Sequence, residues 1–138
     1  MEENMSEKDY LVFLGTRCCL FDFENISQAH IQMNFKMIRD FGDTAYNSDG
    51  SVKHYLHTWD DGDRILVQCQ NCGAFFIVQS SEYHGQEDSY YRDWYQVEDE
   101  QRAIVINNML GGWDLENKYN APWIKATNEV FAWNRGTF

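Results

Sequence analysis

The sequence contains a single proline, Pro122, and only nine glycines among 138 residues. This composition excludes a Pro- or Gly-rich linker, and the chain shows no internal repeat or low-complexity tract. With 43% hydrophobic and 16% aromatic residues, the chain has enough apolar side chains for a folded core. We expect residues 1–138 to form a single domain.

Basic residues are also scarce, because 11 Lys and Arg stand against 22 Asp and Glu and the net charge is −11. A surface that binds nucleic acid or an anionic membrane needs clustered Lys and Arg, so we expect neither kind of partner. A basic protein partner is favoured, since opposite potentials accelerate encounter.

Long apolar runs are absent as well, and no run approaches the roughly 18 residues of a membrane-spanning helix. The segment Met1–Asp9 is acidic, whereas a secretory signal is basic and then apolar. We therefore expect a cytoplasmic protein whose four cysteines stay reduced.

Catalytic signatures are missing too: the chain has no G-x-S-x-G, Walker loop, G-x-G-x-x-G or H-E-x-x-H. We expect that the protein is not an enzyme. A small enzyme that uses the Glu82/His84 region stays as an alternative.

The sequence does contain a Cys69-x-x-Cys72-Gly73 motif between two apolar runs, 65–67 and 74–79. This pattern predicts a β-hairpin with a knuckle in which both sulfurs point to one side and Gly73 adopts a positive φ. The second arm is continuously apolar, as in a central strand covered on both faces.

The knuckle indicates one structural zinc ion or an ancestral, empty site to about the same degree, with redox activity as the third reading. A closed zinc site needs four ligands, so two more are required. If 17–21 is a strand, Cys18 and Cys19 alternate across it and at most one of them faces a given side. The further candidate ligands are Cys18, Cys19 and His84.

The pattern of apolar residues predicts an α+β fold with a mainly antiparallel sheet, a C-x-x-C knuckle hairpin and about two helices on one face. We expect helices from Asn25 or Ser27 to Phe41, where 31–38 also alternates like a strand, and over 98–110. We expect Asp60–Asp63 to form a hairpin turn. The expected strands cover 10–14, 17–21, 54–59, 65–67, 74–79 and 90–97, and 123–126 pairs with 130–133 in a closing hairpin.

The segment from Glu82 to Glu100 holds seven acids against Arg92 alone, interleaved with aromatic residues. If every second side chain of a strand is exposed here, aromatic rings lie beside carboxylates, which is typical of a protein interface. An acidic face that is merely solvated is the alternative. The candidate partner-binding residues are Glu82, Glu87, Asp88, Tyr90, Tyr91, Asp93 and Trp94.

Four strings of the chain resemble a family of small bacterial cytoplasmic proteins with a C-x-x-C-G knuckle, which includes immunity proteins of polymorphic or contact-dependent toxin systems. The resemblance implies binding to a cognate basic toxin domain, such as a nuclease, that is blocked by occlusion and without catalytic residues. A zinc-ribbon-like metal-binding regulatory protein is the alternative. The matching strings are Cys69-Gln-Asn-Cys-Gly-Ala-Phe-Phe76, Gln79-Ser-Ser-Glu-Tyr-His84, Asp88-Ser-Tyr-Tyr-Arg-Asp93 and 128–133.

Overall fold

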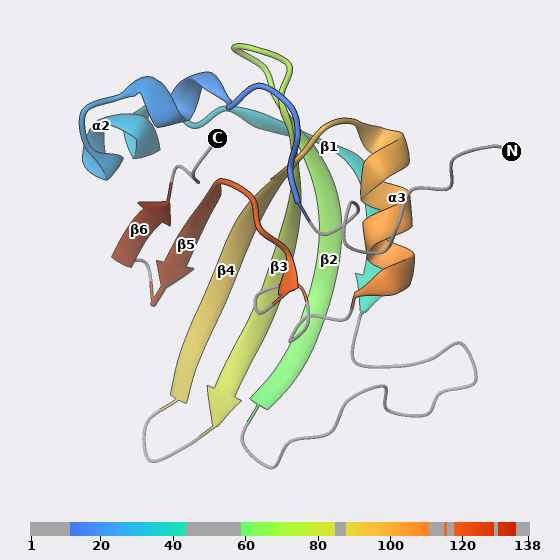
Figure 1. Cartoon of the computed structure of the whole chain (residues 1–138). Helices are drawn as coiled ribbons and strands as arrows, with labels where there is room; N and C mark the ends of the chain where they lie inside the picture. Colours follow the sequence, from blue (N-terminus) through green and yellow to red (C-terminus); the bar gives the residue numbers. More distant parts are fainter. Residues whose placement is uncertain are drawn as a thin grey trace, which may run out of the picture.

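Six strands form one antiparallel sheet in which every strand lies beside its neighbour in sequence, in the order β1-β2-β3-β4-β5-β6 (Figure 1). The structure is a computed structural model that describes residues 12–43, 59–84, 88–110, 115, 118–128 and 130–134. The strands are β1 (Phe35–Asp43), β2 (Trp59–Cys69), β3 (Phe75–His84), β4 (Asp88–Val97), β5 (Trp123–Thr127) and β6 (Val130–Asn134). Among the described residues, the helical elements with defined bounds are the 3₁₀ helix η1 (Cys19–Asp22) and the α-helices α2 (Ile26–Ile31) and α3 (Glu100–Met109).

The sheet is covered on both faces, because neighbouring residues of a strand point to opposite sides and here both sides are apolar. The α3-side core consists of Phe13, Leu66, Ile77, Tyr95, Val97, Ala103, Ile106, Leu110, Leu115, Tyr119 and Ala121. The α2-side core consists of Cys18, Leu20, Phe21, Ala29, Val67, Cys69, Phe76, Val78, Trp94, Ile124 and Ala126.

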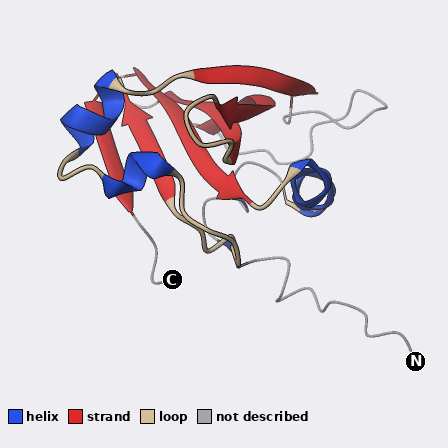
Figure 2. Ribbon diagram, turned by 90° about the horizontal axis from the view of Figure 1, so that it is seen from above, coloured by secondary structure: helices blue, strands red, loops and turns tan. Residues whose placement is uncertain are grey.

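The α+β arrangement agrees with the sequence pattern, but the expectation of both helices on one face is wrong. Residues of α3 belong to one core, whereas η1 and α2 supply residues to the other. Seen from above, α3 lies on one side of β4 and η1 with α2 on the other (Figure 2). The consecutive apolar residues of β2, β3 and β4 require helices on both sides of the sheet, since both faces of these strands are apolar and must be covered.

Two stretches near the N-terminal end differ from their predicted structure. The expected strand 17–21 does not form, because η1 begins at Cys19 within this stretch and residues 17–18 precede it without regular structure. The helix begins as expected, with the Asn25 side chain accepting from the Gln28 N–H at 3.0 Å, but it ends at Ile31. The alternating pattern of 31–38 prevails after that point, and residues from Phe35 on pair with β2.

The acidic stretch Asp60–Asp63 is also not a turn, because it lies inside β2, and its first two residues pair with β3. The register shifts between Asp61 and Arg64, so the strand contains a bulge there, and the bulge accommodates Gly62. The expected strand 54–59 falls mostly outside the described residues, and only Trp59 belongs to β2.

The later elements follow the sequence pattern closely. The side chain of Asp99 caps α3 by accepting from the Arg102 N–H at 2.8 Å. The closing hairpin is β5 with β6, joined around Asn128, whose φ is +49°. None of the helices in the described part of the chain is long and apolar enough to cross a membrane.

Among the described residues, Arg64 is the largest fully buried side chain, and it ties β2 to β3 and to the end of α3. Its Nε donates to Gln79 Oε1 at 2.7 Å, and its Nη1 donates to Asn107 Oδ1 at 3.1 Å and to the Leu110 carbonyl at 2.7 Å. A carbonyl at a helix C-terminus lacks an intrahelical partner, so Arg64 satisfies one of these groups.

Candidate metal centre

The turn between β2 and β3 places Cys69 and Cys72 beside each other. The Cys69 N–H donates to the Ala74 carbonyl at 2.7 Å, and the Gly73 N–H donates to the Cys69 carbonyl at 2.8 Å. Gly73 has a φ of +85°, a conformation that glycine adopts without strain, as its position in the motif indicates. The turn therefore brings Cys72 back toward the end of β2.

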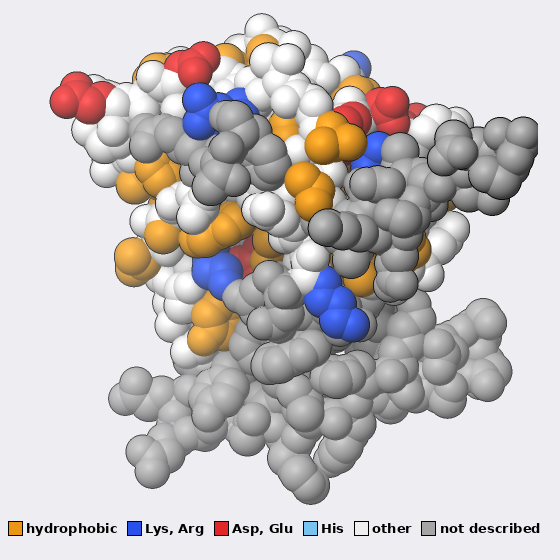
Figure 3. All heavy atoms as spheres, in the orientation of Figure 1, with side chains coloured by type: hydrophobic (Ala, Val, Ile, Leu, Met, Phe, Trp, Pro, Cys, Tyr) orange, Lys and Arg blue, Asp and Glu red, His pale blue; other side chains and the backbone are white. Residues whose placement is uncertain are grey.

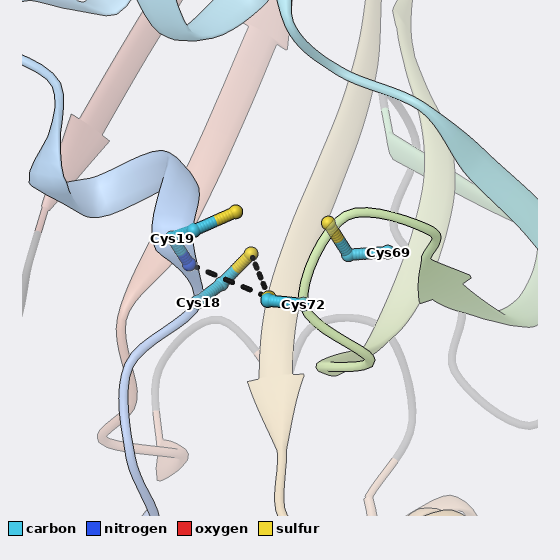
Figure 4. A group of neighbouring side chains, drawn as sticks. All are labelled: Cys18, Cys19, Cys69 and Cys72. Atoms are coloured by element: carbon cyan, nitrogen blue, oxygen red, sulfur yellow. Dashed lines mark hydrogen bonds between the residues drawn. The ribbon is translucent and has the colours of Figure 1, made fainter.

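Cys18 and Cys19 reach the same place from the other side of the turn, where the chain enters η1 (Figure 4). Cys18 is the N-cap residue, with φ −57° and ψ 149°, and Cys19 is the first helical residue. Successive side chains at the start of a 3₁₀ helix are rotated by about 120°, less than the half turn of a strand. Both sulfurs thus lie on the side of the turn, and the expected alternation across a strand is wrong.

A buried glutamine holds this segment against the sheet. Gln96 Oε1 accepts from the Cys18 N–H at 2.9 Å, and Gln96 Nε2 donates to the Thr16 carbonyl at 2.8 Å. Sequence reasoning missed Gln96, although a glutamine between the apolar Tyr95 and Val97 of a strand is a signal that its amide needs a buried partner. Gln96 is a positioning residue for the cysteines.

The four cysteine sulfurs all lie within 4.8 Å of one another. The Sγ atoms of Cys18 and Cys72 are 3.5 Å apart, and Cys72 Sγ accepts from the Cys19 N–H at 3.5 Å. Figure 4 shows the side chains converging from η1 and from the turn. The cluster is compatible with a metal site, and it contains every cysteine of the chain.

The cysteines differ in exposure and in pKa. Burial raises the pKa of Cys18 far above the usual thiol range. Burial, together with the hydrogen bond to Cys72, raises the pKa of Cys19 to about 12. Cys72 is exposed, and although its partial burial raises the pKa, the N–H groups of Cys19 and Ala74 stabilise the thiolate and bring the pKa down to about 7. Cys72 is thus partly ionised near neutral pH before any metal binds.

His84, the further candidate ligand, is not part of the cluster. Its backbone lies at the last residue of β3, whereas the cysteine turn precedes the first. Nine steps of about 3.4 Å separate these ends by roughly 30 Å. His84 therefore cannot share an ion with Cys69 and Cys72.

The residues expected to form one partner-binding face do not share a surface in the structure. Residues 93–97 are all buried, so the expected exposure of every second side chain is wrong there, and Asp93 and Trp94 are unavailable as contacts. Trp94 belongs to the α2-side core, because η1 and α2 cover that face.

Near the other end of β4, Tyr90 is 55% exposed and pairs across the strands with the half-buried Glu82. Tyr91, half-buried, points to the opposite face. Asp88 pairs with His84 at the end of the ladder, and Glu87 lies outside the described residues. In the orientation of Figure 1, the coloured side chains in the middle of the surface are mainly apolar and basic, and most of the acidic ones in view lie near its upper margin (Figure 3).

Comparison of the chain with protein-family models, with curated proteins and with solved structures finds no match.

Proposed function

We propose that the chain is a zinc-binding protein in which Cys18, Cys19, Cys69 and Cys72 hold one structural zinc ion. The observation that carries the proposal is the convergence of four sulfurs within 4.8 Å. Zinc–sulfur bonds of about 2.3 Å in a tetrahedron place sulfurs about 3.8 Å apart. The 3.5 Å separation of Cys18 and Cys72 and the 4.8 Å limit bracket this distance, so side-chain rotations suffice to complete the tetrahedron.

A structural role follows from the number and origin of the ligands. Four protein ligands close the tetrahedron and leave no position for a substrate or a water molecule. The two pairs come from segments about 50 residues apart, so an ion there ties η1 to the β2–β3 turn. The N–H of Cys19 toward Cys72 Sγ is the type of outer hydrogen bond that supports a metal-bound thiolate.

Elemental analysis of the untagged, reduced protein tests the proposal. We expect one zinc per chain, and we expect Cys18→Ser and Cys72→Ser each to lose the metal and to lower the melting temperature. His84→Ala is the matched control, since His84 lies at the far end of β3, and it should retain the metal. Substitution by cobalt(II) should give thiolate charge-transfer absorption. Iron instead of zinc, which four sulfurs also bind, would correct the identity of the ion.

A protein purified under reducing conditions that binds neither zinc nor cobalt would contradict the proposal. So would full metal content in Cys18→Ser, because the site would then not use the N-terminal pair.

A second candidate function is binding to a basic protein partner, as in an immunity protein that occludes a toxin domain. The net charge of −11 and the exposed Tyr90 beside Glu82 favour it. Acids at the rim of an interface chiefly set the association rate, whereas an exposed aromatic ring at its centre controls dissociation.

Binding kinetics with a partner captured from the native cell test this candidate. We expect Glu82→Lys to slow association and to reduce its salt dependence, and Tyr90→Ala to speed dissociation roughly tenfold or more, corresponding to about 1.4 kcal/mol. Asp22→Lys on η1 makes the same change in net charge and is the control. An acidic partner, or unchanged rates in both variants, would rule this surface out.

A further inference from the structure

A close contact between two of the sulfurs joins the two segments that build the cluster. Cys18 Sγ and Cys72 Sγ are 3.5 Å apart, and a disulfide bond requires about 2.05 Å. The gap is small enough for side-chain rotation to close. The adjacent pair Cys18 and Cys19 is a poorer choice, because a bridge between neighbours forms a strained eight-membered ring.

Cys72 is also the cysteine that reagents reach most easily. It is exposed, whereas Cys18 and Cys69 are buried and Cys19 is half-buried. It lines a cavity of about 290 Å³ together with Arg17, Gln96 and Glu98. A molecule as small as hydrogen peroxide fits this cavity and can approach the sulfur.

We propose that a peroxide oxidises Cys72, that Cys18 then forms a disulfide bond with it, and that the metal is released in consequence. This inference rests on the proposed zinc site, and it adds a redox-controlled state to a structural centre. Zinc itself does not change oxidation state, so the sulfurs are the groups that react.

The disulfide forms in two steps. Cys72 Sγ attacks one peroxide oxygen, the O–O bond breaks and hydroxide leaves, which gives a sulfenic acid. The thiolate of Cys18 attacks that sulfur, the S–S bond forms and a second hydroxide leaves. Two protons from solvent convert the hydroxides into water, so two electrons pass from the sulfurs to the peroxide. Cys19 and Cys69 alone no longer complete the ligand set, and the ion dissociates.

The oxidised state keeps the connection that the metal provided. A Cys18–Cys72 bond spans 54 positions of the chain and holds the same segment against the same turn. We therefore expect oxidised, zinc-free protein to melt at a higher temperature than reduced, zinc-free protein, because the cross-link restricts the unfolded chain.

The experiment treats zinc-loaded protein with hydrogen peroxide and follows zinc release with a chromogenic chelator while peptide mapping identifies the bridge. We expect equimolar zinc and Cys18–Cys72 disulfide, and recovery of the zinc form on adding dithiothreitol and zinc. The same mapping on chelator-treated protein should give the same bridge, so this measurement does not depend on metal binding.

Variants separate the outcomes. Cys69→Ser keeps both reacting sulfurs and should still form the bridge, whereas Cys18→Ser should stop at sulfenic or higher acids of Cys72. A zinc-free reduced protein would contradict the proposed function while leaving the bridge to be judged by mapping. Zinc that stays bound under peroxide, or a bridge between Cys69 and Cys72, would overturn this inference.

Discussion

At the scale of single residues, Cys72 differs from Cys18 and Cys19 in a way that chemistry can detect. Its pKa of about 7 results from N–H groups that stabilise the thiolate against the opposing effect of burial. The pKa of Cys19, about 12, is raised by burial and by its neighbours. At neutral pH, Cys72 is thus the nucleophile of the metal-free cluster.

We predict that iodoacetamide modifies Cys72 first in the metal-free, reduced protein. The thiolate is the reactive form, so the rate should rise with pH through a midpoint near 7 and should fall below it as the thiolate is protonated. Mass mapping of protein alkylated between pH 5 and 9 measures the midpoint. Saturating zinc should suppress the reaction, and a midpoint at the ordinary thiol value near 8.5 would contradict the assignment.

Arg64 shows what single-residue reasoning overlooks. It follows three acids and a glycine, a composition typical of a turn, yet it is fully buried. Its hydrogen bonds to Gln79 in β3 and to Asn107 and Leu110 at the end of α3 give the guanidinium three buried partners, which is why its burial is tolerated. Partners so distant in sequence leave no local signal.

At the scale of elements, β3 is one of the strands that contribute side chains to both cores. Phe76 and Val78 point to the α2-side core, and Ile77 points to the α3-side core. Phe75, at the start of the strand, is only partly buried.

We predict that Ile77→Ala lowers the free energy of unfolding by about 2 to 5 kcal/mol, because it leaves a cavity under α3. Phe75→Ala should cost less, since that ring is not enclosed. Ile31→Ala removes the same atoms from a residue that is 78% exposed on α2, and it should change stability by less than about 0.5 kcal/mol. Denaturant midpoints measure all three. Equal losses at Ile77 and Ile31 would show that β3 is not central.

The elements that the sequence predicts well are those with local determinants. Asp99 caps α3, Asn128 turns between β5 and β6, and Gly73 turns between β2 and β3. Prediction is wrong where two periodicities overlap, as in 31–38, and where a bulge lets an acidic, glycine-containing stretch continue a strand, as in Asp60–Asp63. In both places pairing with a distant strand decides the outcome.

The candidate metal site also has one half that local sequence predicts and one half that depends on distant residues. The motif Cys69-x-x-Cys72-Gly73 identifies half of the cluster from sequence alone. The other half, Cys18 and Cys19, depends on η1 and on Gln96, which lies 78 residues beyond Cys18. The sequence indicates both cysteines as candidate ligands, but the strand expected over 17–21 would have directed their sulfurs to opposite faces.

At the scale of the whole molecule, net charge is known from the sequence but its distribution is not. The acids between Glu82 and Glu100 were expected to share one aromatic-rich face. The double covering of the sheet instead buries Asp93 and Trp94 and leaves Tyr90 and Glu82 near the end of the ladder. Among the described residues, the surface available to the proposed basic partner is therefore smaller than the sequence indicates.

The segment 12–21 joins the two cores, and this connection affects how the protein unfolds. It supplies Phe13 to the core beneath α3 and Cys18, Leu20 and Phe21 to the core on the opposite side, and Phe13 N–H is fixed to the Asn120 carbonyl at 2.9 Å. Local unfolding of either core would therefore remove residues 12–21 from the other core as well. Melting should therefore be cooperative across the sheet, and a disturbance at the cysteines should accelerate amide hydrogen exchange on the distant, α3-covered side as well.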